Sequence, residues 1–251
     1  MKWQATLYKD KHNFVYDYGT GLLELLAAKP GEHILDLGCG TGHLTKTIHE
    51  QCGSAVGMDN SAEMIESAKE SFPEIEFYVR DATKFQCTTP FDAIFSNAAL
   101  HWVHPPEKAV RCMRNNLVTG GRLVLELGGK GNIAAITHQL TTTLNDFGYT
   151  PKPAEEVWYF PSISEYTALL ESNGFEVSIA QLFDRPTELA SATSGIRDWL
   201  TMFASDFFVG IAREQVTAII TTMQEQLKPQ LFQNGKWYAD YRRLRIIAKK
   251  V

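Results

Sequence analysis

Short apolar runs alternate with stretches of helical periodicity through the first half of the chain. The apolar runs, which we interpret as strands, lie at residues 33–37, 55–58, 75–79, 91–96 and 122–127. Helical stretches between most of them lie at 44–51, 62–71 and 106–115, with Ser61 as a candidate N-cap and Pro106 in a first turn. Because repeated β-α units of this length form parallel sheets, the pattern predicts a doubly wound α/β fold.

The two ends of the chain follow a different pattern. An amphipathic helix is expected at 14–28, before the stop signal Pro30-Gly31. After Gly128-Gly129 we expect helices at 133–147 and 164–172, a strand at about 175–183, a helical stretch at 195–228 and a final strand. Because these late helices are interrupted, we interpret them as a cap on the same sheet.

Composition and charge narrow the function classes. Hydrophobic residues make up 44% of the chain and charged residues 21%, as in ordinary soluble enzymes. The formal net charge of −5 disfavours a broad nucleic-acid-binding surface, which draws on clustered Lys and Arg. The one basic cluster, YRRLRIIAKK, alternates as a strand does, which favours a solvated face carrying Arg243 and Arg245 opposite Leu244 and Ile246.

The cysteines are scattered and form no C-x-x-C pair: Cys39, Cys52, Cys87 and Cys112. We therefore expect no metal site and no disulfide framework, and a reducing cytoplasm fits best. The N-terminal stretch MKWQATLYKDKHNF lacks the apolar core of a signal peptide, and no apolar run is long enough to span a bilayer. A membrane location is therefore not expected.

The stretch HILDLGCGTGHLT, residues 33–45, passes from a strand through a glycine-rich turn into a helix. Such a turn lets the backbone approach a ligand closely and directs free N–H groups toward anionic groups, which serves several nucleotide cofactors equally. The dinucleotide fingerprint G-x-G-x-x-G would require a glycine at position 43, where His43 stands. The spacing therefore argues against the interpretation of the chain as an NAD-dependent oxidoreductase.

Acidic residues end the first three predicted strands. Asp36 precedes the turn, Asp59 ends the second strand, and Asp81 follows the third. A carboxylate at the end of the second strand can accept hydrogen bonds from both ribose hydroxyls, and Asp81 could accept from an adenine amino group. Since ligands of doubly wound sheets bind at the carboxyl ends of the strands, the three acids predict a nucleoside site.

The ordered series ILDLGCGTG, GMDNSAEMI, RDATKF, FDAIFSNAALHWV and TGGRLVLEL, over roughly residues 30 to 130, resembles the motifs of class I S-adenosylmethionine-dependent methyltransferases. The resemblance implies a seven-stranded, mostly parallel Rossmann-like sheet with an antiparallel terminal strand between two others. It also implies one domain over 1–251. Its parts would be an N-terminal lid and helix (1–29), a cofactor-binding core (30–130), cap helices with one core strand (131–235) and a terminal strand (236–251).

Within that class, WQATLY, SNAALHW and DYRRLRIIA resemble the trans-aconitate group of small-molecule carboxyl methyltransferases, although His101 stands where a glutamine is expected. The resemblance implies S-adenosyl-L-methionine as cofactor and S-adenosyl-L-homocysteine as product. The cofactor-binding residues that it implies are Asp36, Gly38, Cys39, Gly40, Asp59, Asn60, Met64, Asp81, Ala82 and Asn97.

Methyl transfer from a sulfonium mainly requires alignment and exclusion of water, and a carboxylate acceptor needs no base. His101 is the best-placed candidate for a general base, and its alternative is a pocket-lining residue. Candidate substrate walls are Trp3, Tyr8, His101, Trp102 and Trp199, of which Trp102 and Trp199 could equally be core. Arg185, Arg242 and Arg243 could pair with a substrate carboxylate or be surface charges.

The sequence thus predicts an enzyme that methylates a small molecule at a carboxylate or another oxygen, as a monomer or homodimer. Nitrogen or carbon methylation of a small metabolite stays open. A non-catalytic S-adenosylmethionine-binding protein also stays open, because the sequence shows no indispensable catalytic side chain.

Overall fold

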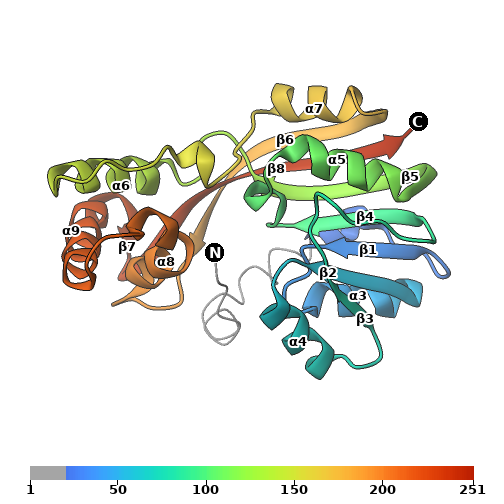
Figure 1. Ribbon diagram of the computed structural model, residues 1–251, viewed down its shortest axis with the longest axis horizontal. Helices are drawn as coiled ribbons and strands as arrows, with labels where there is room; N and C mark the ends of the chain where they lie inside the picture. Colours follow the sequence, from blue (N-terminus) through green and yellow to red (C-terminus); the bar gives the residue numbers. More distant parts are fainter. Residues whose placement is uncertain (1–20) are drawn as a thin grey trace.

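The computed structural model describes residues 21–251, and its centre is one mixed sheet (Figure 1). The strand order is β3-β2-β1-β4-β5-β8-β6, and a short extra strand, β7, pairs with β8. The strand bounds are His33–Leu37 (β1), Ser54–Asp59 (β2), Glu76–Val79 (β3), Phe91–Asn97 (β4), Leu117–Gly128 (β5), Phe175–Glu188 (β6), Phe232–Gln233 (β7) and Lys236–Lys250 (β8). The predicted seven-stranded doubly wound sheet is confirmed, with β7 as an addition.

The terminal strand β8 lies between β5 and β6 and is antiparallel to both. Its alternating Leu244 and Ile246 are fully buried, which anchors the strand in the sheet. The strands β1 to β5 pair in parallel, so their carboxyl ends share one edge of the sheet. The inserted antiparallel strand that the family resemblance implied is therefore confirmed.

Helices cover both faces of the sheet. Their bounds are His43–Cys52 (α3), Ala62–Ser71 (α4), Pro106–Asn115 (α5), Ala134–Asp146 (α6), Ile163–Glu171 (α7), Gly195–Phe203 (α8) and Arg213–Leu231 (α9). Three short 3-10 turns span Leu100–Trp102 (η1), Ala154–Glu156 (η2) and Ser205–Phe208 (η3). In Figure 1, α5 and α7 lie on one side of the sheet and α3 and α4 on the other. Residues 21–26, which are also helical, pack their leucines with α3.

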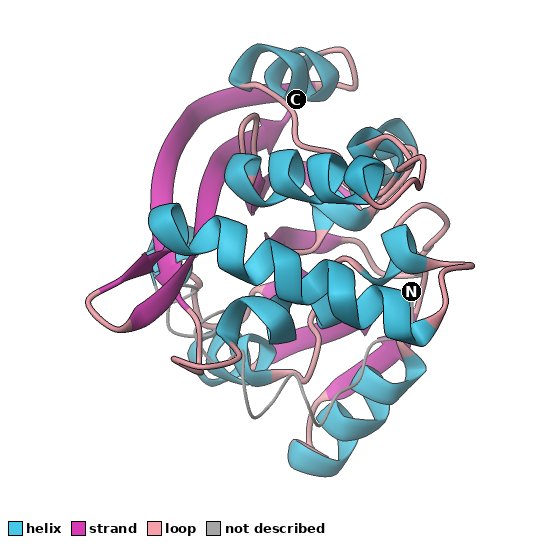
Figure 2. Cartoon of the chain, turned by 90° about the vertical axis from the view of Figure 1, so that its left-hand side faces the viewer, coloured by secondary structure: helices cyan, strands magenta, loops and turns pink. Residues whose placement is uncertain are grey.

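The helices α6, α8 and α9 gather beside the sheet, where the long strands β6 and β8 extend to meet them (Figures 1 and 2). They enclose a second apolar core that contains Trp158, Trp199 and Trp237. We call α6, α8, α9 and the turns η2 and η3 the helical group. Because β8 belongs to both cores, it couples the helical group to the sheet.

The predicted helical stretch at 195–228 is wrong as a single element. Helix α8 ends at Phe203, and α9 begins only at Arg213. Between them, the chain forms η3 and passes through Gly210 at φ +84°, a conformation that side-chain-bearing residues rarely adopt. At this break the chain changes direction, and the side chains of Phe207 and Phe208 pack in the second core. In residues 21–251, no helix is long and apolar enough to cross a membrane.

Candidate functional site: a glycine turn and an aromatic pocket

The glycine turn, residues 38–42, connects β1 to α3 at the carboxyl edge of the sheet. The N–H groups of Gly38 and Cys39 both donate to the Met58 carbonyl oxygen, at 2.7 and 3.0 Å, which ties the turn to the end of β2. Gly40 has φ +53°, and a Cβ placed on it would meet no heavy atom within 4 Å. The backbone at Gly40 therefore faces open space, as a close-approaching ligand requires.

Asp59 lies beside this open space, half-buried at the end of β2. Its Oδ2 accepts from the Gly40 N–H at 3.0 Å, and its Oδ1 accepts from the Ser61 N–H at 2.8 Å. Burial raises the pKa of this carboxyl group, and these backbone bonds oppose the rise. Ser61 is the N-cap of α4, as predicted, so Asp59 is not needed for that role.

Asp36 lies beneath the turn and is almost fully buried. The Thr45 hydroxyl donates to its Oδ2 at 2.7 Å. Burial raises the pKa of Asp36 to about 7; the Thr45 bond lowers it in part, and the charge of Asp59 adds to the rise. Burial also raises the pKa of the Cys39 thiol well above its usual value, so the thiol stays neutral.

Asp81 follows β3 and is bound locally. Its Oδ1 accepts from the Thr83 backbone N–H and hydroxyl at 2.8 and 2.7 Å, while Lys84 Nζ lies 3.4 Å from Oδ2. Desolvation raises the pKa of Asp81, but the Thr83 bonds and Lys84 outweigh it and leave the pKa below its ordinary value. The remaining cofactor-binding candidates differ in exposure. Asn60 is exposed and Ala82 is half-buried, whereas Met64 in α4 and Asn97 at the end of β4 are buried.

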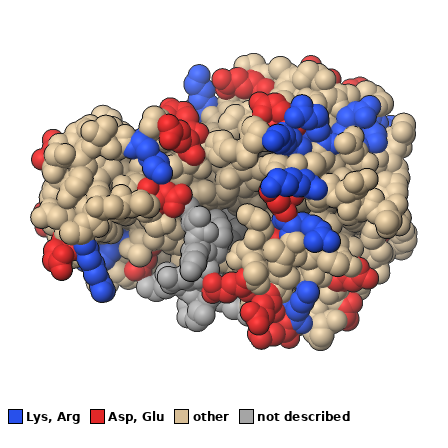
Figure 3. All heavy atoms as spheres, in the orientation of Figure 1, with Lys and Arg blue, Asp and Glu red and all other residues tan. Residues whose placement is uncertain are grey.

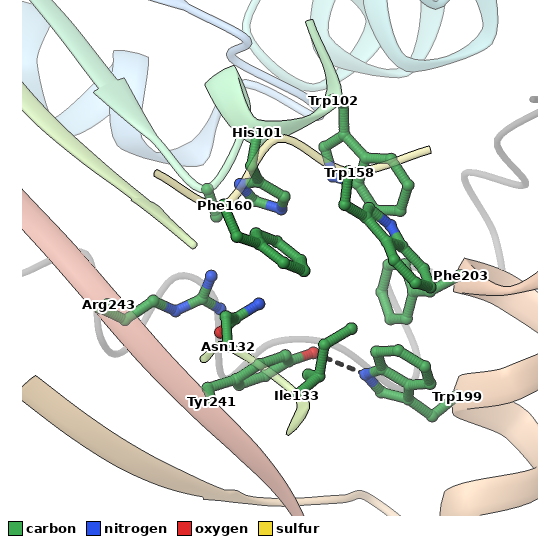
Figure 4. A pocket seen from close by; sticks show the side chains of 11 residues that line it. His101, Trp102, Asn132, Ile133, Trp158, Phe160, Trp199, Phe203, Tyr241 and Arg243 are labelled. Carbon is green, nitrogen blue, oxygen red and sulfur yellow. Dashed lines mark hydrogen bonds between the residues drawn. The ribbon is translucent and has the colours of Figure 1, made fainter. Parts of the chain in front are cut away.

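A pocket lies between the sheet edge and the helical group (Figure 4). It holds about 450 Å³ of empty space, part of which is open to solvent. Aromatic side chains from η1, α8, β8 and the segment after η2 form most of its wall: Trp102, Trp158, Phe160, Trp199, Phe203 and Tyr241. We call it the aromatic pocket.

The aromatic walls brace one another. Trp158 and Phe160 are stacked, with centroids 5.9 Å apart, and the Trp199 Nε1–H donates to the Tyr241 hydroxyl at 2.7 Å. In Figure 4, Trp102, Trp158, Phe203 and Trp199 lie on one side of the opening, whereas His101, Asn132 and Arg243 lie on the other. The pocket thus has an apolar side and a polar side.

His101 belongs to the polar side and is buried. The Gly128 N–H donates to its Nδ1 at 3.3 Å. Because Nδ1 accepts a bond, the neutral ring carries its proton on Nε2 and offers a donor there. Burial, together with a smaller effect of Arg243, holds the pKa of His101 well below its usual value. His101 is therefore neutral and presents an N–H donor, which weakens its predicted role as a general base.

Arg243 supplies the charge of the pocket. Its guanidinium Cζ lies 4.2 Å from the Tyr241 ring centroid, a cation–π arrangement, and only 6% of its surface is exposed. The prediction of a solvated face carrying Arg243 and Arg245 is wrong. β8 is a central strand that has helices and loops over both faces, so its basic side chains are covered rather than solvated.

The neighbouring arginines have other partners. Arg185 and Arg245 bind the buried Glu126 from two sides, with Nη2–Oε2 distances of 2.9 and 2.7 Å. Arg242 lies with its Nε 3.3 Å from Asp184 Oδ1 and its side chain 43% exposed. Of the three arginines that the sequence offered for a substrate carboxylate, Arg243 is the one in the pocket wall.

The sequence-predicted substrate residues divide into two groups. His101, Trp102 and Trp199 line the aromatic pocket. Trp199 also belongs to the second core, so both of its predicted roles apply. Trp3 and Tyr8, with the predicted lid and the start of the helix expected at 14–28, lie outside the described residues.

Sequence reasoning did not single out several wall residues, among them Asn132, Trp158, Phe160 and Tyr241. A usable signal existed in the connector PKPAEEVWYFPS, where three aromatic residues stand together between prolines. Tyr241 and Arg243 share one face of the terminal strand by simple alternation.

The aromatic pocket and the glycine turn meet at the loop after β4. Ala98 lines the pocket, and a Cβ on Gly38 would lie only 2.1 Å from the Cβ of the next residue, Ala99. The two parts of the site are therefore in contact through two consecutive residues. In residues 21–251, no group of His, Cys, Asp or Glu side chains is arranged to hold a metal ion.

The doubly wound sheet with its inserted antiparallel strand, together with the glycine turn and Asp59, defines the Rossmann-like methyltransferase class. A family model described as a methyltransferase domain matches residues 34–121. The chain is 32% identical over 260 residues to an uncharacterised methyltransferase of Schizosaccharomyces pombe, and the alignment covers 99% of this chain and 98% of that relative. It is 28% identical to trans-aconitate 2-methyltransferase of Klebsiella pneumoniae, and that alignment covers 99% of this chain and 98% of the relative.

Solved structures share the fold. The YcgJ protein of Bacillus subtilis superposes with a TM-score of 0.64 at 21% identity, over 93% of this chain and 98% of that one. The chain therefore belongs to the class I S-adenosylmethionine-dependent methyltransferases and resembles their trans-aconitate group. It is an enzyme whose cofactor is S-adenosyl-L-methionine. The oxidoreductase and non-catalytic alternatives are thereby set aside.

Proposed function

We propose that this enzyme transfers the methyl group of S-adenosylmethionine to a carboxylate oxygen of a small molecule held in the aromatic pocket. One observation carries the proposal: the polar side of the pocket combines the buried Arg243 guanidinium with the Nε2–H of His101. A cation and a neutral donor directed at one space suit an anionic oxygen acceptor. The resemblance to trans-aconitate 2-methyltransferases supports the same chemistry.

The residues around the glycine turn fit the cofactor. The Asp59 carboxylate accepts backbone bonds from Gly40 and Ser61, and its further acceptor sites can serve ribose hydroxyls. The open space at Gly40 leaves room for the methionine part beside Cys39 and Gly38. In this proposal, the remaining cofactor-binding residues are Asp36 beneath the turn, Asn60 and Met64 bordering the adenine, Asp81 and Ala82 at the adenine edge, and Asn97 at the ammonium group.

The chemistry asks little of the protein beyond positioning. The bound cofactor supplies an electrophilic methyl group on a sulfonium, and a carboxylate is already a nucleophile at neutral pH. His101 and Arg243 then orient one carboxylate oxygen toward the glycine turn, while the aromatic side of the pocket excludes water. We assign His101 as a donor that positions the acceptor, since its Nδ1 is occupied by the Gly128 N–H.

In this proposal, two parts of the chain have different roles. Residues 30–130 hold the cofactor, and 131–251 close the acceptor side through the helical group and β8. The predicted lid of 1–29, the cytoplasmic location and the monomeric or homodimeric state remain predictions. On the face drawn in Figure 3, acidic and basic side chains are interspersed. That the protein does not bind nucleic acid also remains a prediction.

A methyl-transfer assay tests the proposal. The protein is incubated with labelled S-adenosylmethionine and, separately, small carboxylic acids, phenols and amines, and the products are resolved by mass spectrometry. We expect alkali-labile methyl esters from one or more acids. Turnover confined to amines, or to carbon atoms of a metabolite, would replace the proposal by the nitrogen or carbon alternative.

A further inference from the structure

A comparison of two buried asparagines singles out one wall residue of the aromatic pocket. Asn116 and Asn132 each expose 3% of their surface. Asn116 Oδ1 accepts from the Cys87 N–H at 2.7 Å, and its Nδ2 donates to two main-chain carbonyl oxygens, at 2.8 and 3.2 Å. Asn132 Oδ1 accepts from the Arg242 N–H at 2.8 Å, but within residues 21–251 no oxygen accepts a hydrogen bond from its Nδ2. Asn132 therefore has a buried donor that the fold itself does not use.

The amide of Asn132 can point only one way. A main-chain N–H is always a donor, so the Arg242 N–H fixes Oδ1 as the atom beside β8 and directs Nδ2 away from that strand. A Cβ placed on Gly128 would lie 2.8 Å from Asn132 Nδ2 and 2.6 Å from Phe160 Cε1, so the glycine leaves the space that the amide occupies. In Figure 4, Asn132 lies beside Arg243 at the edge of the open space.

Asn132 lies in the loop between β5 and α6, which β8 holds in place. The Gly129 N–H donates to the Arg242 carbonyl oxygen at 2.9 Å, and the Ile133 N–H donates to the Asp240 carbonyl oxygen at 3.0 Å. Ile133 has φ +50°, a left-handed conformation that a β-branched residue rarely adopts. Because such strain persists only where surrounding contacts fix it, the loop is a rigid support for the donor of Asn132.

His101 offers a second donor to the same space. The Gly128 N–H donates to His101 Nδ1 at 3.3 Å, which leaves the Nε2–H for the pocket. Asn132 and His101 therefore both approach Gly128, one from the loop after β5 and the other from η1. Each has its acceptor atom occupied by a main-chain N–H and offers only a donor to the pocket. A group bound between them needs lone pairs and no hydrogen of its own, which describes a carboxylate oxygen and excludes an ammonium group.

We propose that Asn132 is a substrate-binding residue, whose Nδ2–H acts with the Nε2–H of His101 to bind one oxygen of the acceptor carboxylate and leave the other to accept the methyl group. This inference rests on the proposed function, since it specifies how the acid is held. An acceptor that places no oxygen there leaves both N–H groups unpaired in the wall, so Asn132 selects acids over amines.

Two substitutions separate a ligand-binding role from a structural one. Asn132→Asp keeps an acceptor for the Arg242 N–H but replaces the donor by a negative charge, whereas Asn132→Ala removes both groups. With the acid that the parent methylates fastest, we expect kcat/KM to fall about tenfold in Asn132→Ala and about 100-fold or more in Asn132→Asp. A purely structural role gives the opposite order, because Asn132→Asp retains the bond to the main chain. Turnover of Asn132→Asp equal to or above that of Asn132→Ala overturns the inference.

The nearby Arg243 requires a control, since the carboxylate introduced at position 132 can pair with its guanidinium. Such pairing is impossible in Arg243→Met. We expect Asn132→Asp to lower kcat/KM by a further tenfold, roughly, in the Arg243→Met background, because the repulsion between the two carboxylates remains. A loss that occurs only when Arg243 is present contradicts direct binding of the acceptor by Asn132.

Asn116 provides a matched control for stability. In Asn116→Asp the carboxylate would face two carbonyl oxygens, so we expect Tm to fall by about 5 °C or more. Asn132→Asp should shift Tm by less than about 3 °C and leave the affinity for S-adenosylhomocysteine within about twofold of the parent. A fall in Tm as large as in Asn116→Asp contradicts the inference, because the Nδ2 of Asn132 would then have a structural partner.

A binding measurement distinguishes failure of this inference from failure of the proposed function. Three of the five tryptophans line the pocket, so entry of trans-aconitate or benzoate should change tryptophan fluorescence in the protein saturated with S-adenosylhomocysteine. Methylation of acids that the Asn132 variants leave unchanged overturns the inference alone. Binding of these probes that weakens in Asn132→Asp, without methylation of any acid, contradicts the proposed function alone. Neither binding nor methylation of any acid contradicts both.

Discussion

The glycine turn and the aromatic pocket are adjacent, but they are built in different ways. The turn and its acid Asp59 come from segments fewer than thirty residues apart, and main-chain N–H groups make most of the contacts. The pocket combines η1, the loop after β5, the segment after η2, α8 and β8, and its contacts are made by side chains. A shared cofactor can be bound by backbone geometry, whereas selection of an acceptor requires particular side chains.

The electrostatics of the two regions differ in the same way. Buried carboxyl groups dominate the turn, where desolvation raises the pKa of both Asp36 and Asp59. A guanidinium and a neutral imidazole dominate the polar side of the pocket. In the proposed function, Asp59 therefore lies beside a cationic cofactor and Arg243 beside an anionic acceptor. The substitutions below test each region while leaving the other as its control.

The largest expected effect is on stability and concerns Asp36. The folded pKa of about 7 lies above the usual 3.8, so the folded state holds an extra proton between these values. The free energy of unfolding should therefore fall as pH rises from about 4 to about 7, by up to about 4 kcal/mol, and stay low above that. Asp36→Asn keeps an acceptor for the Thr45 hydroxyl but cannot ionise.

We expect Asp36→Asn to remove most of this dependence and to be more stable than the parent at pH 8. Urea unfolding of the cofactor-free protein at pH 5 and pH 8 measures the difference. The exposed Asp184 provides a control, because Asp184→Asn should leave the pH dependence in place. The same slope in the parent and in Asp36→Asn would show that this carboxyl is not the group that titrates.

Asp59→Ala should have the next largest effect, on cofactor affinity. Losing two charge-assisted bonds to ribose hydroxyls is expected to weaken S-adenosylhomocysteine binding about 100-fold, measured by calorimetry. Asp81→Ala is the matched control: its oxygens already bind Thr83 and Lys84, so a smaller loss is expected. Unchanged affinity in Asp59→Ala would contradict the proposed assignment of the glycine turn and Asp59 as the cofactor site.

The contrast between the regions also explains what the sequence could predict. Asp36, Asp59 and the glycines stand at fixed offsets within β-α units, so periodicity places them on the shared strand edge. The parallel sheet followed from the same repetition, and the inserted antiparallel terminal strand followed from the family resemblance. Local signals of this kind survive in a single sequence because the geometry that they specify is local.

The pocket could not be predicted in the same way. Trp158 and Tyr241 are 83 positions apart, and nothing in either segment indicates that their side chains line the same pocket. The alternation of β8 was visible, but it does not say which face is covered. Arg243 was therefore assigned to a solvated face, and burial by distant elements reversed the assignment.

Arg243→Met tests the pocket with the turn as control. Losing the cation should lower kcat/KM for an acid acceptor by about 30- to 100-fold, since a charged hydrogen-bonding partner contributes roughly 2 to 3 kcal/mol. Affinity for S-adenosylhomocysteine should stay within about twofold of the parent. Arg242→Met removes a neighbouring exposed charge of the same strand and should leave turnover nearly unchanged. Equal losses in both variants would mean that the effect is not specific to the pocket.

The smallest effect expected is at His101, and it distinguishes a donor from a base. Glutamine can reproduce both observed roles, with its Oε1 accepting the Gly128 N–H and its amide donating into the pocket, although it cannot act as a base. We expect His101→Gln to retain kcat within about threefold of the parent. His101→Leu should lose about tenfold or more, because it removes the donor and leaves the Gly128 N–H without its partner.

Rates for the two His101 variants with the same acid, measured at saturating cofactor, give the comparison. The parent kcat should show no inflection near pH 6.5, because the lowered pKa of His101 keeps the ring neutral throughout the working range. Loss of activity in His101→Gln as severe as in His101→Leu, together with such an inflection, would return His101 to the role of general base. The acceptor would then be a hydroxyl or an amine, since a carboxylate has no proton for a base to remove.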